Sequence, residues 1–317
     1  MRFRLIFLSL ITLVSGFSTE LFDTLQHDSF YANSAYCLDR YIFPSLFQKG
    51  KDYLEHEGLV MAGVFTPTFI NLALSGDAFI AVNTTSKQII VSFRGTSDIA
   101  DWIVDVDFAQ NSYSPLSASA SCDGTCKVHK GVYEAFKKVF TKIVGTLKNT
   151  AKSYSDYEII VTGHSLGGGY ALLMGIELQL LGYKPSVITY GGLRMGNNDF
   201  NKWVNNLFAV ESSAAKVGAG EYVTNTFIRV VQQHDIVPYL PPGNDYGHAG
   251  IQFQIDQADS YTVTQNQVEY DSSDYSTPSL TDSNYLQSGK ILKLKISDHL
   301  KYFRRMGKPC YADSVTV

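Results

Sequence analysis

The fold class follows from one segment, Glu158-Ile-Ile-Val-Thr-Gly-His-Ser-Leu-Gly-Gly-Gly-Tyr-Ala171. Its β-branched first part predicts a buried strand, and the apolar residues that follow predict a helix. A G-x-S-x-G sequence, Gly163 to Gly167, joins the two parts, and this context is typical of a nucleophile elbow that presents Ser165. The glycines let strand and helix pass close together. A phosphate-binding turn is the alternative, but neither G-x-G-x-x-G nor a Gly-Lys-Ser/Thr ending is present.

A serine hydroxyl needs a neighbouring base to become a nucleophile, and in α/β-hydrolases the chain order is serine, carboxylate, histidine. Residues Thr226 to Val231 predict a further strand, and Asp235 follows its C-terminal end. Catalytic groups in open α/β sheets collect at the carboxyl ends of the strands. We therefore predict Asp235 as the acid; its other interpretation is a turn or helix-cap aspartate.

Three histidines lie beside or after Asp235, namely His234, His248 and His299. We predict His299 as the base, because it lies near the chain end in a segment that a late loop could fold over the elbow. His248 is the alternative base, and otherwise a hydrogen-bonded loop histidine. His164, next to the serine, is expected to pack under the elbow. The base takes the serine proton, the aspartate orients the imidazole, and an acyl-enzyme forms and is hydrolysed.

The oxyanion of the tetrahedral intermediate requires hydrogen-bond donors. The backbone N–H of Leu166 is the first candidate. The second must follow an earlier strand, and Gln88 to Phe93 predict a strand that ends in a glycine turn before Thr96. A capping threonine at a plain strand end is the alternative interpretation of Thr96.

Seven motifs, in order, resemble the fungal triacylglycerol lipases of lipase class 3 between about Ser29 and Cys310. They are Phe93-Arg-Gly-Thr96, the Asp101-Trp102 pair, Val128-His-Lys-Gly131, Thr162-Gly-His-Ser-Leu-Gly-Gly168, Tyr190-Gly191 with Arg194-Met-Gly-Asn197, Asp235-Ile-Val-Pro238 and Asp298-His-Leu-Lys-Tyr-Phe303. One departure is that Leu193 replaces the proline that these lipases usually carry before the arginine. This departure bears on the backbone of the turn from Gly191 to Asn197 and not on the catalytic residues.

The resemblance implies an α/β-hydrolase fold, with a mostly parallel central sheet flanked by helices and a short helical lid. It also implies Ser165 as nucleophile, Asp235 as acid, His299 as base, and Thr96 with Leu166 as the oxyanion hole. No cofactor and no metal is implied.

The segment after Thr96 bears on the substrate. Ile99, Trp102, Ile103 and Val106 follow helical spacing, while three aspartates fall on the other face, Asp98, Asp101 and Asp105. Such a helix can cover a hydrophobic cleft and meet a lipid surface when it opens. In the resembling lipases this region is the lid, whereas related feruloyl esterases have a polar loop there. A surface helix packed permanently on the core is the alternative.

We predict a triacylglycerol lipase that hydrolyses acylglycerol esters with lid-gated access at an oil-water or membrane interface. A phospholipase A1 or feruloyl-type esterase on the same fold, or a catalytically silent lipid-binding protein, are the alternatives. The 317 residues and 45% hydrophobic content suit one large domain over residues 17–317. A net charge of -4 without a basic footprint gives no sign of a nucleic-acid partner. No obligate protein partner is implied.

Residues 1–16 have a basic start, an apolar run and small residues at the end, which predicts a secretory signal peptide cut after Gly16 or Ser18. The apolar run is too short to span a bilayer easily, although an uncleaved signal anchor is the alternative. We expect the protein to be extracellular. Ser212 to Gly220, rich in small residues, is expected to be a loop.

Export makes the four cysteines a disulfide question with three possible pairings. Spacing and the family resemblance favour Cys122 with Cys126 and Cys37 with Cys310. Metal binding is not expected, because the short cysteine pair has no second pair of ligands nearby. Asn83 begins an Asn-Thr-Thr sequon in a predicted turn, so we expect a glycan there.

Overall fold

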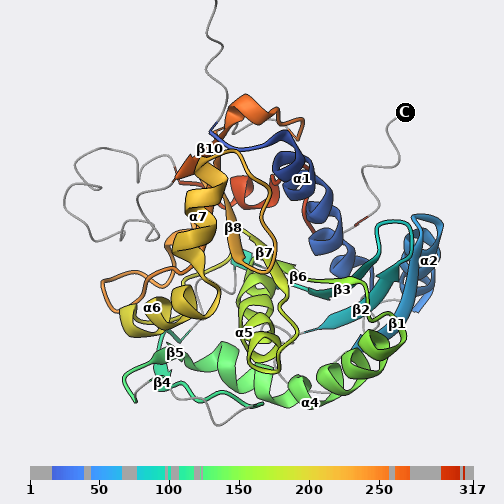
Figure 1. The fold of residues 1–317 in the computed structure, drawn as a ribbon, viewed down its shortest axis with the longest axis horizontal. Coiled ribbons are helices and arrows are strands. Elements are labelled where there is room, and N and C mark those ends of the chain that lie inside the picture. The colour runs from blue at the N-terminus through green and yellow to red at the C-terminus, as the bar shows by residue number, and fades with distance from the viewer. Residues whose placement is uncertain are drawn as a thin grey trace, which may run out of the picture.

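The computed structural model describes residues 16–38, 44–65, 77–96, 99–100, 107–117, 122, 124–256, 261–271, 294–307 and 310 (Figure 1). Except for Gly16, the predicted signal peptide lies outside the described residues. None of the helices in these ranges combines the length and the hydropathy that a membrane crossing requires.

A mostly parallel sheet forms the centre of the molecule (Figure 1). Its described strands, in spatial order, are β1 Leu59–Phe65, β2 Ala78–Asn83, β3 Gln88–Phe93, β6 Glu158–His164, β7 Ser186–Tyr190, β8 Phe227–Gln232, β9 Ile251–Ile255 and β10 Val268–Asp271. The pairings from β3 to β9 are parallel, and those of β1 with β2, β2 with β3 and β9 with β10 are antiparallel. A separate small sheet pairs β4 Gln110–Ser112 with β5 Lys127–His129.

Helices cover both faces of the sheet. Their bounds are α1 Thr19–Ser34, α2 Pro44–His56, α4 Lys130–Ser153, α5 Leu166–Leu180, α6 Asn198–Leu207 and α7 Val210–Gly218. On one face Leu21 of α1 lies near Ile188 of β7. On the other face Gly175 of α5 packs so closely on Val187 that a Cβ there would collide with its side chain. Because both faces are covered, β6 and β7 are buried along nearly their whole length, as parallel strands usually are.

The prediction of a loop from Ser212 to Gly220 is wrong, because most of this segment is helix α7. Val210, Ala214 and Val217 are buried at i, i+4 and i+7, which is the spacing of one helix face. Alanine and serine predominate between these positions, so the composition resembled a loop while the apolar spacing did not.

The two predicted disulfides are both present. Cys37 pairs with Cys310 with a Cα–Cα distance of 5.2 Å, and Cys122 pairs with Cys126 at 5.7 Å. The first bridge joins the short 3-10 helix η1 (Ala35–Leu38) to the tail that follows His299.

Candidate active site

Ser165 lies in a strained turn between β6 and α5. Its φ of 61° and ψ of -130° are unusual for a residue with a side chain, and the following residue begins α5. A Cβ at Gly163 would collide with the Gly167 backbone, and one at Gly167 would collide with the Phe93 carbonyl. The two glycines are therefore required, because strand, helix and the end of β3 meet here without room for side chains.

Asp235 and His299 form a buried pair. The Nδ1 atom of His299 lies 2.7 Å from the Oδ2 atom of Asp235, and both side chains are almost inaccessible to solvent. Asp235 follows β8, as predicted from the sequence, and His299 belongs to the 3-10 helix η6 (Ser297–Leu300). The backbone N–H of Val237 donates to the other carboxylate oxygen at 2.8 Å, and the Tyr302 hydroxyl donates to Oδ2 at 2.5 Å.

One cavity of about 280 Å³ brings Ser165 and His299 together. Its lining residues are Tyr36, Thr96, Ile99, Ala100, His164, Ser165, His299, Leu300, Arg305, Met306 and Gly307. Within the described part of the chain, neither the Ser165 hydroxyl oxygen nor the His299 Nε2 atom has a hydrogen-bond partner, although both are buried. Buried polar atoms are normally satisfied, so two orphaned ones beside a cavity indicate groups kept free for a ligand or reaction.

His164 supports the elbow from below, as its position beside the serine predicted. Its Nε2 atom lies 2.8 Å from the His299 carbonyl oxygen, so Nε2 carries the hydrogen, and its Nδ1 accepts from the Tyr36 hydroxyl at 2.8 Å. Burial, and then the nearby His299, hold the pKa of His164 well below its usual range. His164 is therefore a neutral linker between η1, the elbow and the turn that carries His299.

His248, the alternative base, does not line the cavity of Ser165. Its Nε2 atom donates to the Pro238 carbonyl at 2.7 Å. Burial, followed by Arg229 and Arg194, lowers its pKa well below the usual range. The structure thus gives His248 the role of a hydrogen-bonded loop histidine.

The two candidate oxyanion-hole residues flank Ser165. Leu166 is the first residue of α5, where N–H groups have no partner within the helix, and Thr96 lines the cavity. A Cβ built on Gly95 would lie 3.0 Å from the Ser165 Cβ, so the turn after β3 packs directly on the elbow.

Of the predicted lid residues, Ile99 alone is described. It is partly buried, packs on the core and lines the cavity beside Ala100. Trp102, Ile103 and Val106 lie outside the described residues. Beyond these residues, the Phe108 carbonyl accepts from the Tyr246 hydroxyl at 2.9 Å.

Leu193, in place of the family's usual proline, is buried. The neighbouring Arg194 N–H donates to the Leu240 carbonyl at 2.7 Å, and the Arg194 guanidinium reaches the Gly243 carbonyl at 3.2 Å. The loop from Leu240 to Gly243 therefore fixes this turn.

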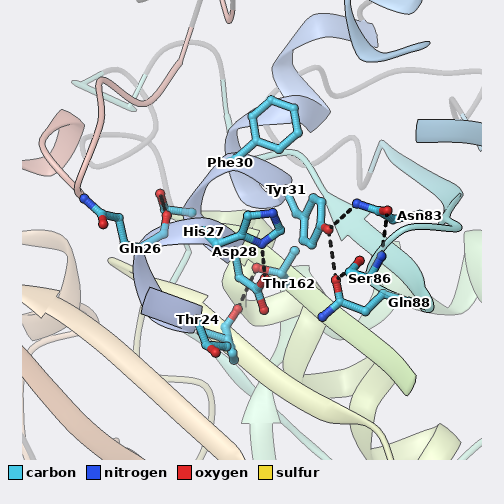
Figure 2. Close-up of polar contacts among 12 residues, drawn as sticks. Thr24, Gln26, His27, Asp28, Phe30, Tyr31, Asn83, Ser86, Gln88 and Thr162 are labelled. Atoms are coloured by element: carbon cyan, nitrogen blue, oxygen red, sulfur yellow. Dashed lines mark hydrogen bonds and ion pairs between the residues drawn. The ribbon is translucent and has the colours of Figure 1, made fainter. Parts of the chain in front are cut away.

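Asn83, the predicted glycan site, ends β2 and belongs to a polar cluster with Tyr31 of α1 (Figure 2). Its Oδ1 atom accepts the N–H groups of Thr85 and Ser86 at 3.0 and 3.1 Å, and its Nδ2 atom donates to the Tyr31 hydroxyl at 3.1 Å. The sequon thus forms a tight Asx turn, as expected for a strand connection.

Sequence reasoning missed Tyr302 and Asp298. Tyr302 bonds to Asp235, and Asp298 is a buried carboxylate that accepts from Lys301 Nζ at 3.0 Å and lies 3.8 Å from His234 Nδ1. Both residues lie inside the Asp298-to-Phe303 motif, so the motif contained the signal, but no spacing rule assigned them a role.

The comparisons with known proteins agree with this geometry. A family model described as lipase (class 3) matches residues 90–245, a range that contains Thr96, Ser165 and Asp235. The chain belongs to the lipase class 3 family. This confirms the family that the sequence motifs indicated.

Individual relatives match over a longer stretch of the chain than that range. A lipase of Rhizomucor miehei is 32% identical over 243 residues, which cover 74% of this chain and 57% of that protein. Secreted mono- and diacylglycerol lipase 1 of Fusarium solani is 29% identical over 237 residues, 72% of this chain and 60% of that protein. The chain therefore spans about three fifths of these curated relatives.

Solved structures of fungal lipases match the fold. The Lip2 lipase of Yarrowia lipolytica is similar with a TM-score of 0.72 at 26% identity, covering 92% of this chain and 96% of that one. The predicted α/β-hydrolase fold is thereby confirmed.

Proposed function

We propose that this chain hydrolyses carboxylic ester bonds of acylglycerols, with Ser165 as nucleophile, His299 as base and Asp235 as the orienting acid. One observation carries the proposal: the His299–Asp235 pair at 2.7 Å presents an unpartnered Nε2 atom to the same cavity as the unpartnered Ser165 hydroxyl. The names of two relatives, a lipase and a mono- and diacylglycerol lipase, support acylglycerols as substrates.

The chemistry follows from the tautomer of His299. Asp235 accepts the Nδ1 hydrogen, which leaves the Nε2 lone pair to take the Ser165 proton as the hydroxyl oxygen attacks the ester carbon. When the tetrahedral intermediate collapses, the C–O bond to the alcohol breaks and Nε2 returns the proton to the leaving alkoxide. Water then repeats the sequence on the acyl-enzyme, which releases the fatty acid and restores Ser165.

The oxyanion of each intermediate would be held by the Leu166 N–H and by Thr96. In a serine protease, removal of one such donor costs roughly 3 to 4 kcal/mol of transition-state stabilisation. Access would be controlled by a lid that carries Ile99, Trp102, Ile103 and Val106. With such a lid, activity rises at a lipid interface.

The mature chain would begin at Phe17 after cleavage of a secretory signal, in preference to cleavage after Ser18. Phe17 is buried and its ring lies edge-on to Phe253, with a centroid distance of 4.9 Å. Ser18 caps α1 by accepting the Leu21 N–H at 3.3 Å. Amino-terminal sequencing of protein secreted by a yeast host tests this boundary, and a start at Thr19 would contradict it.

Hydrolysis of tributyrin, measured below and above its solubility limit, tests the activity. We expect a rate increase above the limit, and a loss of about four orders of magnitude or more in Ser165→Ala and His299→Ala with the fold retained by circular dichroism. If wild-type protein hydrolyses no ester, only a lipid-binding role remains. Normal turnover in His299→Ala would mean that another histidine is the base, and His248 would be tested next.

A further inference from the structure

Three cations follow His299 within six positions, and two of them are engaged. Lys301 Nζ bonds to the buried Asp298 carboxylate at 3.0 Å. Arg304 Nε donates to the Ser29 hydroxyl at 2.9 Å, and its guanidinium lies 5.3 Å from the centre of the Phe30 ring. No polar or ionic side-chain contact of the third cation, Arg305, occurs within the described residues.

The fold places Arg305 at the cavity of Ser165. A tight turn follows η6, in which Lys301 and Arg305 form an antiparallel bridge and the Met306 N–H donates to the Leu300 carbonyl at 2.9 Å. Phe303 adopts a positive φ of 55° at the tip of this turn. The turn sends Tyr302 inward to Asp235 and leaves Arg305 exposed on the cavity lining.

Arg305 is the one permanently charged residue among the described residues that line this cavity. The rest of the lining is apolar or neutral, and includes Ile99, Leu300 and Met306, which suit an acyl chain. His164 is kept neutral by its lowered pKa. A triacylglycerol offers the Arg305 guanidinium only neutral ester oxygens, whereas hydrogen bonds from a guanidinium to an anion are roughly twice as strong.

We propose that Arg305 is a specificity-determining residue that selects acyl esters carrying a phosphate beside the scissile bond, as glycerophospholipids do. A guanidinium binds phosphate oxygens through two parallel hydrogen bonds, which suits it to this group. This inference rests on the proposed ester hydrolysis and names a further substrate class for the same site.

Two other anions compete with a phospholipid headgroup as the binding partner of Arg305. One is free phosphate, which has the same chemistry without the acyl chains. The other is an aspartate of the lid segment, Asp98, Asp101 or Asp105, none of which is described. These alternatives give different outcomes in the same experiment.

The test compares dihexanoylphosphatidylcholine with dihexanoylglycerol, both below aggregation, so that the two substrates differ only in the headgroup. The measured quantity is the ratio of their kcat/KM values in wild type, Arg305→Gln, Arg305→Lys and the matched control Lys138→Gln. Lys138 is an exposed residue of α4 outside the cavity. We expect the phospholipid-to-diacylglycerol ratio to fall about fivefold in Arg305→Gln through a loss of phospholipid turnover, with dihexanoylglycerol turnover unchanged. The ratio should fall less in Arg305→Lys and stay unchanged in Lys138→Gln.

Several outcomes would overturn the inference while leaving the proposed function intact. They are no phospholipid hydrolysis by wild type, an unchanged ratio in Arg305→Gln, or an equal fall in Lys138→Gln. A rise in dihexanoylglycerol turnover in Arg305→Gln without a change in phospholipid turnover would indicate a lid aspartate as the partner. Inhibition by inorganic phosphate that requires Arg305, without a change in the ratio, would indicate a free-anion site. Failure of wild type on both dihexanoylglycerol and emulsified tributyrin would instead count against the proposed function.

Discussion

The Asp235 carboxylate accepts hydrogen bonds from three groups, His299, Tyr302 and the Val237 N–H. Burial, and then Asp235 itself, raise the pKa of Tyr302 well above its usual range, so its hydroxyl stays protonated and donates. The same hydroxyl accepts the Gln232 N–H at 3.1 Å. Tyr302 is therefore a positioning residue that fixes the acid relative to the end of β8.

For Tyr302→Phe we expect kcat to fall about tenfold and the free energy of unfolding to fall by about 1 to 2 kcal/mol, because Asp235 loses one donor and the Gln232 N–H loses its acceptor. Steady-state kinetics as a function of pH, together with urea denaturation, measure both effects. A stability loss with unchanged kcat and an unchanged pH profile would reduce Tyr302 to a structural role.

Asp28 on α1 is buried away from the cavity, beside His27 (Figure 2). One carboxylate oxygen lies 3.0 Å from His27 Nδ1, and the other has no hydrogen-bond partner within the described chain. Burial raises the pKa of Asp28, and the bond to His27 opposes the rise only in part. The folded state therefore holds the Asp28 proton to higher pH than the unfolded chain does.

This raised pKa predicts a pH-dependent effect of Asp28→Asn. Between the ordinary pKa of 3.8 and the raised folded value, the folded protein binds more protons, so wild-type stability falls as the pH rises through this window. We expect the unfolding free energy of Asp28→Asn to gain on that of wild type between pH 4 and pH 7. Urea titrations at both pH values measure the unfolding free energy of Asp28→Asn minus that of wild type, and a fall in this difference from pH 4 to pH 7 would contradict the prediction.

At the scale of elements, the approach of β6, α5 and the end of β3 leaves no space at Gly167. Its Cβ would meet the Phe93 and Arg94 backbone, which cannot move aside as a side chain can. For Gly167→Ala we expect a loss of at least about 2 kcal/mol in unfolding free energy together with loss of activity. Gly145→Ala is the matched control, since a Cβ in that helical position meets nothing and should stabilise α4 by about 0.5 to 1 kcal/mol. Equal stability of both variants would argue against this crowding.

The elbow, β3 and β8 could be predicted from the sequence because their apolar runs are continuous and end at glycine or polar turns. Helix α7 could not, because its buried Val210, Ala214 and Val217 are separated by alanine and serine, which occur equally in loops. The order of the motifs along the chain was enough to indicate Ser165 and His299. The position of Arg305 at the cavity could not be predicted, because it depends on how the turn after η6 folds in three dimensions.

At the scale of the whole molecule, the Cys37–Cys310 bridge spans 273 positions and joins the segment after α1 to the last described residue. In the chain-entropy model, its removal in Cys37→Ser/Cys310→Ser costs up to about 5 kcal/mol of unfolding free energy. Removal of Cys122–Cys126, with a separation of 4, costs about 2 kcal/mol in the same model. Urea denaturation of the two double variants checks the order, and a larger loss for the short bridge would contradict it.

The Cys37–Cys310 bridge also has a consequence for where the protein can work. Cys37 follows Tyr36, whose hydroxyl bonds to His164 beneath the elbow, and Cys310 follows the turn that carries His299. Reduction of this disulfide would remove the covalent link between the η1 segment, which contacts His164, and the tail that follows the turn carrying His299. We therefore expect ester hydrolysis to be slower in the reduced protein than in the oxidised protein, and to recover when the disulfide re-forms.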